Sequence, residues 1–315
     1  MAHELHVVFG SGQVGSTLAG QLLAEGCRVR VFKRSARGVP DGAELLQGDA
    51  TDAASCRAAV EGASTVYHCM NPPYAAEVWA DLLPRFMRNL IEAAAGIRLV
   101  VLDNLYALGR PNGSKLSEDS PVNPCSRKGE MRAVAAAMLL EAHQRGDIRG
   151  TIGRGSDFYG PRGTETHLGD QFWPGVLAGK KGRIVVDPDA IHTYHYIPDV
   201  ARGLARLGNG PDDVYGKTWM LPCQPAETLR ELIGRLSGVL GREIALTQVP
   251  RWLVKSLGLA MPIMRELDEM MYQWDEPFVV DDRRFRERFG VNPEDRDDAA
   301  RETVAWARSW YGPKG

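Results

Sequence analysis

The sequence predicts an α/β fold: a doubly wound parallel sheet of the Rossmann type with a smaller, discontinuous C-terminal lobe. An apolar run over residues 5–9 leads into a glycine-rich turn, and a helical pattern follows directly. Further β-prone runs then alternate with helical segments, which is typical of a parallel sheet with helices on both faces. The 315 residues suffice for such a sheet and a second lobe.

The elements can be assigned in chain order. Expected strands cover residues 5–9, 27–32, 44–47, 65–70 and 98–103, and expected helices cover residues 16–25, 53–61 and 76–95. Pro84 predicts a kink or a boundary within the third helix. We assign residues 1–162 to a Rossmann domain to which residues 190–210 return, and residues 163–315 mainly to a substrate-binding lobe. Residues 163–182 are too rich in glycine and aromatics to predict a regular element.

Composition favours a protein that binds small molecules. Lys and Arg total 38 against 40 Asp and Glu, so the net charge of −2 predicts no nucleic-acid partner. Five widely spaced cysteines without a CxxC pair predict reduced thiols in a cytoplasm, with neither disulfides nor structural zinc. We find no signal-peptide pattern and no apolar run long enough to span a bilayer, so we expect no membrane partner.

The glycine-rich turn is typical of a dinucleotide-binding loop. Its order, from Gly10 to Gly15, is Gly-Ser-Gly-Gln-Val-Gly. Gly10 permits the tight turn, Gly12 lets the backbone approach a pyrophosphate, and Gly15 allows close packing of helix on strand. With Ser11, Gln13 and Val14 these residues would present free N–H groups at a helix N-terminus. The alternative is an ordinary turn between a strand and a helix.

The end of the second expected strand indicates which dinucleotide is bound. Lys33 and Arg34 stand there, and no acidic residue does. An Asp or Glu would accept a hydrogen bond from the ribose 2′-hydroxyl of NAD(H), whereas a basic residue would pair with the 2′-phosphate of NADP(H). We therefore favour NADP(H) over NAD(H). The alternative is that both cations are simply solvated at a strand end.

Two further strand ends belong to the expected ligand crevice. Asp49 follows Gly48 after the third strand, and Asn71 precedes Pro72 and Pro73 after the fourth. Since the carboxyl ends of parallel strands meet at one edge of the sheet, both side chains are candidate cofactor-binding residues.

The ordered motifs resemble those of an extended or atypical short-chain dehydrogenase/reductase, of the subgroup called NAD-dependent epimerase/dehydratase. The resemblance covers most of the chain and includes the glycine loop, the basic strand end and the Gly-Asp turn. It continues through three later segments, at residues 104–109, 154–161 and 196–201.

The resemblance implies a catalytic Ser or Thr and a Tyr-x-x-x-Lys pair, and here the sequence differs. Asn104 stands at the serine position, Pro124 stands four residues before Lys128, and no Tyr-x-x-x-Lys occurs in the chain. Lys128 could still bind the nicotinamide ribose, or it could be a solvated cation. Tyr106 could replace the missing acid, with Asn104 orienting the substrate oxygen, although an aromatic after a strand is commonly packed.

Candidate substrate residues lie in the segment 154–161 and in the insertion that follows it. The family position of Asp157 resembles an Asn that contacts nucleotide-diphosphate sugars, and a carboxylate there would repel a diphosphate. Asp157 could instead be a cap or turn residue. We add Tyr159 and, in the 163–182 insertion, Trp173 as candidate substrate contacts.

The remaining C-terminal residues give weaker indications. His192 and His195 lack a third nearby ligand, so we expect packed or hydrogen-bonded histidines and no metal. Asp199 is expected to cap a helix over residues 200–207. The methionine- and aromatic-rich region 252–274 suggests core, dimer surface or part of the pocket wall, and a homodimer is possible.

Together these observations lead to a hypothesis of function. We expect an NADP(H)-dependent oxidoreductase that exchanges hydride with a carbonyl or conjugated carbonyl of an apolar small molecule. The alternatives are an epimerase, dehydratase or cyclase that uses bound cofactor, and a non-catalytic protein that senses NADP(H).

Overall fold

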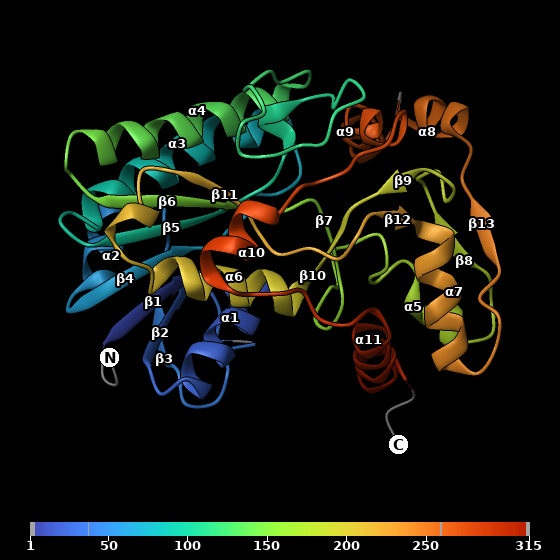
Figure 1. Cartoon of the computed structure of the whole chain (residues 1–315), viewed down its shortest axis with the longest axis horizontal. Coiled ribbons are helices and arrows are strands. Elements are labelled where there is room, and N and C mark those ends of the chain that lie inside the picture. Colours follow the sequence, from blue (N-terminus) through green and yellow to red (C-terminus); the bar gives the residue numbers. More distant parts are fainter. Residues whose placement is uncertain (1–3, 37, 259, 313–315) are drawn as a thin grey trace.

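The computed structural model describes residues 4–36, 38–258 and 260–312. Its main sheet has seven parallel strands in the order β3-β2-β1-β4-β5-β6-β11 (Figure 1). The strands are β1 Leu5–Phe9, β2 Arg28–Lys33, β3 Glu44–Gln47, β4 Ala63–His68, β5 Arg98–Asp103, β6 Arg149–Arg154 and β11 Thr218–Met220. The predicted α/β fold with a Rossmann-type sheet is therefore confirmed.

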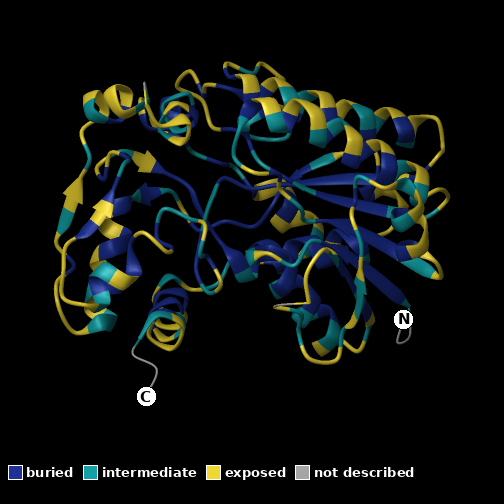
Figure 2. Ribbon diagram, turned by 180° about the vertical axis from the view of Figure 1, so that it is seen from behind, coloured by how far each residue is buried: buried dark blue, intermediate teal, exposed yellow. Residues whose placement is uncertain are grey.

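Helices cover both faces of this sheet. α1 (Gln13–Ala24) packs beside α6 (Ile197–Gly208) on one face, and α2 (Ala53–Val60), α3 (Ala76–Ala93) and α4 (Arg127–Gln144) cover the other. All five residues of β1 are buried, which explains why that strand is apolar without alternation (Figure 2). The crevice-forming carboxyl ends of the strands face the second lobe (Figure 1).

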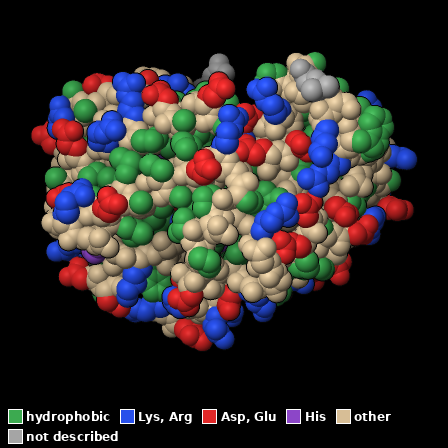
Figure 3. Space-filling model, turned by 90° about the horizontal axis from the view of Figure 1, so that it is seen from above, with side chains coloured by type: hydrophobic (Ala, Val, Ile, Leu, Met, Phe, Trp, Pro, Cys, Tyr) green, Lys and Arg blue, Asp and Glu red, His purple; other side chains and the backbone are tan. Residues whose placement is uncertain are grey.

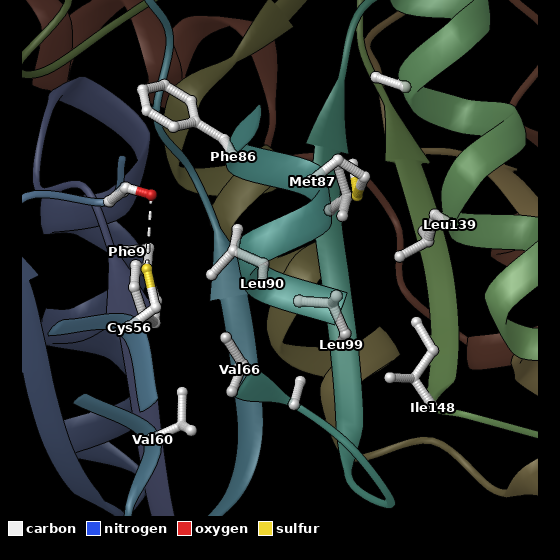
Figure 4. Close-up of a cluster of buried hydrophobic side chains, with 14 of the residues drawn as sticks. Phe9, Cys56, Val60, Val66, Phe86, Met87, Leu90, Leu99, Leu139 and Ile148 are labelled. Atoms are coloured by element: carbon white, nitrogen blue, oxygen red, sulfur yellow. Dashed lines mark hydrogen bonds between the residues drawn. The ribbon is translucent and has the colours of Figure 1, made fainter. Parts of the chain in front are cut away.

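Two apolar clusters hold the layers together. Figure 4 shows the cluster under α2, α3 and α4, where Phe9, Val66 and Leu99 of the sheet meet Leu90 of α3. The cluster on the opposite face joins sheet residues to α1 and α6. Burial of a side chain of this size stabilises the fold by about 1.5–3 kcal/mol, so both helical layers are fixed firmly to the sheet.

The second lobe is built from short elements around its own core. Its strands pair as β7 (Asp157–Tyr159) with β10 (Tyr194–Tyr196), β9 (Ile191–His192) with β12 (Glu227–Thr228), and β8 (Gly182–Ile184) with β13 (Leu246–Gln248). Its helices are α5 Trp173–Leu177, α7 Leu229–Leu240, α8 Arg251–Gly258, α9 Pro262–Asp268 and α11 Arg296–Tyr311. The chain crosses back to the Rossmann sheet with α6, β11 and α10 (Arg283–Phe289).

Two local predictions were wrong, and a third was excluded in part. α3 continues through Pro84, so the boundary that was one of the two alternatives there does not occur; its apolar face packs along the sheet. The segment 163–182 contains a regular element, the short helix α5, with Pro174 in its first turn. Asp199 lies inside α6 rather than at its N-cap; its buried carboxylate accepts a hydrogen bond from the Glu294 N–H at 2.9 Å.

The methionine- and aromatic-rich region divides between interior and surface. Met270, Met271, Tyr272 and Trp274 are buried. Other large apolar side chains of α8 and α9 and of the turn between them are exposed, namely Trp252, Leu257, Met261 and Ile263. Figure 3 shows the face of the molecule that includes these helices, where apolar side chains lie among charges of both signs. No helix in the described ranges is long and apolar enough to cross a membrane.

Candidate active site

The loop after β1 has the geometry that a pyrophosphate requires. Gly10 has φ +89°, and a Cβ at Gly15 would lie 2.0 Å from the Gly10 carbonyl oxygen. At Gly12 a Cβ would meet no atom within 4 Å, so the backbone there is open to a ligand. Gly12 is the N-cap of α1 and no side chain caps this helix, which leaves its first N–H groups available. These residues therefore fit a dinucleotide.

Side chains of the loop complete this cradle. The one hydroxyl hydrogen of Ser16 is shared between the carbonyl oxygens of Ser11, at 2.7 Å, and Gly38, at 3.2 Å, which holds the loop in place. Ser11 Oγ and Gln13 Oε1 are buried without a hydrogen-bond partner in the described part of the chain. Val14 is buried in the core, so only its backbone can face a ligand. The two unpaired oxygens suit a polar ligand beside the helix N-terminus.

The basic strand end lies next to an acidic residue. Lys33 is half-buried, and desolvation lowers its pKa. Arg34 is exposed and close enough to Asp49 to help lower the pKa of that carboxyl, although the main cause is the hydrogen bond from the Thr51 N–H. Asp49 accepts that bond at 2.9 Å. The end of β2 thus presents two cationic side chains, Lys33 and Arg34, and the Asp49 carboxylate lies near Arg34.

Lys128 is held by α9 rather than solvated, so that alternative was wrong. Its side chain is 0% exposed, and its ammonium pairs with Glu266 and, at 2.6 Å, with Glu269. It also donates to the Glu266 carbonyl oxygen at 3.1 Å. Because an ammonium has three N–H donors, these acceptors satisfy all of them. A cofactor ribose could bind the Lys128 ammonium only if α9 moved, so that at least one of its three N–H donors lost its present acceptor.

Glu266 fastens α9 to the Rossmann domain at a second point. Its carboxylate accepts a hydrogen bond from the Ala76 N–H at 3.1 Å, where α3 begins. Burial by itself would raise the pKa of Glu266, but Lys128 and the Ala76 hydrogen bond outweigh it and hold the pKa below the usual range. α9 therefore bridges the first turns of α3 and α4.

Asn71 contacts a residue that our sequence reasoning missed. Its side-chain oxygen accepts a hydrogen bond from Arg132 at 2.6 Å. Arg132 also lies 3.5 Å from Asp103 and stacks over Trp79, and Asp103 pairs with Arg154 at 3.1 Å. These groups are buried at the ends of β5 and β6, apart from the exposed Asn71. This charged network joins α4 to the ends of β5 and β6.

Tyr106 and Asn104 lie together at the end of β5. The Asn104 side chain accepts a hydrogen bond from the Tyr106 N–H at 3.1 Å, which fixes the turn. The Tyr106 hydroxyl lies 3.4 Å from the hydroxyl of Tyr74, which packs over the Lys128 ammonium. Burial, helped by the charge of Asp157, raises the pKa of Tyr106 to about 12. The phenol therefore stays protonated at neutral pH and can donate a hydrogen bond.

Asp157 lies in β7 between two histidines. Its carboxylate oxygens lie 2.7 Å from His192 Nε2 and 3.6 Å from His167 Nε2. Burial would raise the pKa of Asp157, but the contacts with His167 and His192 outweigh it and hold the pKa well below the usual range. The group is therefore an ionised carboxylate at neutral pH, and not a helix cap.

The other candidate substrate residues are less accessible. Tyr159 is buried and donates to the Gln224 side chain at 2.6 Å, and Trp173 is buried in the core of the second lobe. His195 accepts from the Ser156 N–H at 3.0 Å and faces the Leu221 carbonyl at 3.2 Å, so it is a hydrogen-bonded histidine in a strand, as expected. Among the described side chains no cluster of His, Cys, Asp or Glu is arranged to hold a metal.

Tyr74, Arg132, Glu266 and Glu269 were not predicted from the sequence. Arg132 follows Lys128 by four residues, a spacing that places both on one side of a helix, so this residue could have been found. Glu266 and Glu269 lie more than a hundred residues from Lys128 in the chain. No local pattern signals such a contact.

Comparison with known proteins gives a family and a fold. The family model described as "NAD dependent epimerase/dehydratase family" matches residues 7–220. The dTDP-glucose 4,6-dehydratase of Mycolicibacterium smegmatis is 25% identical over 301 residues, which cover 87% of this chain and 82% of that protein. The 3-diazoavenalumate denitrifying reductase of a Streptomyces species is 30% identical over 172 residues, or 49% of this chain and 56% of that protein.

One curated match is short, and the structural matches are long. The 3 beta-hydroxysteroid dehydrogenase/Delta 5-->4-isomerase of Mycobacterium tuberculosis is 45% identical over 64 residues, 20% of this chain and only 17% of that protein. The crystal structure of UDP-glucuronic acid 4-epimerase from Bacillus cereus in complex with NAD matches with TM-score 0.77 and 16% identity, covering 98% of this chain and 99% of the other. At that identity the structural match shows the fold alone.

Proposed function

Because the chain belongs to the NAD-dependent epimerase/dehydratase family, we propose that it is an NADP(H)-dependent oxidoreductase. It would exchange hydride with a carbonyl or conjugated carbonyl of an apolar small molecule. The observation that carries this proposal is the arrangement at the carboxyl ends of the sheet. A loop that fits a dinucleotide lies at the end of β1, a protonated phenol lies just after β5, and an ionised carboxylate lies in β7, which follows β6.

The choice of NADP(H) rests on Lys33 and Arg34. A ribose 2′-phosphate would gain charge-assisted hydrogen bonds from these cations, and no acidic side chain of β2 competes with it. Asp49 is an anion close to Arg34, and its electrostatic contact with Arg34 would weaken the preference.

The substrate class rests on Asp157 and the aromatic groups around it. An ionised carboxylate repels a diphosphate, which disfavours nucleotide-sugar substrates. Trp274 packs against both histidines, and Tyr74 and Tyr106 lie close enough to Asp157 for its charge to raise the pKa of each phenol. Such surroundings favour a molecule with one polar group on an apolar body.

Within this site the residues of the chain would orient the substrate. A bound nicotinamide would supply or accept the hydride. Tyr106 would donate a hydrogen bond to the substrate oxygen, and the hydrogen bond from the Tyr106 N–H to Asn104 would hold the phenol in position. The Arg132–Asp103–Arg154 network would keep the ends of β5 and β6 rigid beneath it.

The proposal is tested by incubating the protein with NADPH and a panel of apolar ketones, aldehydes and enones. We expect loss of absorbance at the reduced nicotinamide band with at least one compound. Binding of NADPH without oxidation by any member would overturn the reductase assignment. Isomerised or dehydrated product with no net change in cofactor would instead indicate the epimerase, dehydratase or cyclase alternative.

All three N–H donors of the Lys128 ammonium already have acceptors, and this favours a second candidate function, that of a protein that senses NADP(H). If α9 moves when cofactor binds, the movement of Glu266 and Glu269 would report the cofactor to a partner. Such a protein would bind NADPH without turnover, and hydrogen exchange in residues 262–268 would increase on binding. Unchanged exchange there would exclude this candidate.

A further inference from the structure

We propose that His167 is the residue that exchanges a proton with the substrate oxygen, and that Asp157 and His192 position it. This inference rests on the proposed hydride-transfer function and names the group that replaces the missing tyrosine. It arises from three side chains on separate segments: the loop before α5, strand β7 and strand β9.

The Asp157 carboxylate connects the two imidazoles through its two oxygens. Oδ1 lies 3.6 Å from His167 Nε2, and Oδ2 lies 2.7 Å from His192 Nε2. A carboxylate next to an imidazole orients the ring and stabilises its protonated form, as in hydrolase triads. The same arrangement here would orient the His167 ring beside a substrate.

His192 is the fixed member of the cluster. It is fully buried, with its ring stacked between Trp274 and Phe278 at 5.1 Å from each. The Ser156 hydroxyl donates its hydrogen to the Thr193 carbonyl oxygen at 2.6 Å, so it can only accept from His192 Nε2, 3.1 Å away. His192 Nε2 therefore carries a hydrogen, which it donates to Ser156, and it lies 2.7 Å from Asp157 Oδ2. Asp157 Oδ2 itself has no hydrogen-bond partner among the described residues, so His192 holds the carboxylate by charge and by close packing.

His167 is the accessible member. Its side chain is 24% exposed, that of Asp157 is 19% exposed, and that of His192 is 0% exposed. The His167 ring lies edge-on to Trp274, with 5.1 Å between ring centroids, so one aromatic residue contacts both imidazoles. A substrate or solvent molecule can reach His167 but not His192.

The other titratable groups around Asp157 cannot serve as bases. Those that its charge affects, besides the two histidines, are Tyr74, Tyr106, Tyr194 and His195. Burial, helped by this charge, raises the pKa of each phenol, so all three stay protonated at neutral pH. Burial lowers the pKa of His195 to about 4, and its ring is already hydrogen-bonded to backbone. His167 remains as the candidate, because its imidazole is partly exposed and lies beside Asp157.

The proposed step balances in both directions. During reduction the carbonyl oxygen forms an O–H bond as an N–H bond of the His167 imidazolium breaks, while the carbonyl carbon receives the hydride that a bound nicotinamide supplies. His167 becomes neutral, Asp157 stays ionised, and solvent returns the proton. During oxidation neutral His167 takes the proton from the alcohol oxygen, and the hydride of the alcohol carbon would go to a bound oxidised nicotinamide.

The first test is chemical rescue of His167→Ala with free imidazole. We expect kcat to fall at least about 100-fold, the usual scale for loss of a general acid, and to recover about tenfold when imidazole is added. The dissociation constant of NADPH should stay within about twofold. Glu165→Ala, an exposed change in the same loop, is the matched control and should leave kcat unaltered. A loss of less than threefold in His167→Ala, or a loss that imidazole does not restore, would overturn the proposal.

The second test does not depend on turnover. The Asp157 carboxyl carbon is followed by NMR against pH, with Asp157→Asn used to identify its signal. In His167→Gln the pKa of Asp157 should rise toward its usual range, because one of the two contacts that lower it is removed. An unchanged titration would overturn the proposal. If the unaltered protein reduces no carbonyl, the proposed function fails, and this titration still decides whether Asp157 and His167 act together.

Discussion

The contact between Lys128 and α9 predicts a large loss of stability when its anions are neutralised. The perturbation is the double change Glu266→Gln and Glu269→Gln, which keeps the side-chain size but leaves an ammonium that is 0% exposed with only neutral acceptors. Removing the partner of a buried charge costs about 3–5 kcal/mol. Glu269 is 20% exposed whereas Glu266 is 6% exposed, so Glu266→Gln alone should account for most of the loss.

The assay is urea unfolding of the unaltered protein, the double variant and a triple variant that adds Lys128→Met. The triple variant removes the buried charge altogether, so most of the lost unfolding free energy should return. An unfolding free energy in the double variant within about 0.5 kcal/mol of the unaltered protein would refute the reasoning. So would a triple variant as unstable as the double.

The pH dependence of this contact provides a control. The pKa of Glu266 is lowered in the folded state, so its stabilisation is present at neutral pH and is lost as pH falls through that pKa. The difference in unfolding free energy between the unaltered protein and Glu266→Gln should therefore shrink on acidification. If this difference in unfolding free energy grew on acidification, the contacts with Lys128 and Ala76 would not be what lowers the pKa of Glu266.

Three further predictions concern single residues. Arg34→Ala should reduce the preference for NADPH over NADH by about 10-fold or more, the scale of one charge-assisted hydrogen bond, whereas equal or tighter NADH binding by the unaltered protein would refute the cofactor assignment. Tyr106→Phe should lower kcat by at least tenfold through loss of its hydrogen bond, and a smaller loss would remove Tyr106 from the mechanism. Burial raises the pKa of Asp199 to about 6, so its folded form binds the proton more tightly than the unfolded form and its charge is destabilising above that pH. Asp199→Asn should therefore gain up to about 3 kcal/mol in unfolding free energy at pH 8 relative to pH 4, and an equal effect at both pH values would contradict this.

The sequence was sufficient for the sheet and for the cofactor loop, because both depend on local patterns. Apolar runs such as β1 and β5 are buried on both faces, and the alternation of such runs with helices permits few topologies. The turn at Gly10 and the close approach at Gly15 are fixed by steric demands that only glycine meets. Lys128 could likewise be singled out from its place in the chain.

The environment of the reacting groups was decided by tertiary structure. No sequence pattern indicates that Glu266 and Glu269 pair with the Lys128 ammonium. Nor does any pattern indicate that His167 and His192 lie on either side of Asp157. Both sets of contacts join segments that are distant in the chain. The free energy of a buried charge depends on every group packed around it, including groups contributed by a different lobe. The sequence therefore determined the loop at which we propose that a dinucleotide binds, and only the folded chain determined which charged side chains lie around Lys128 and Asp157.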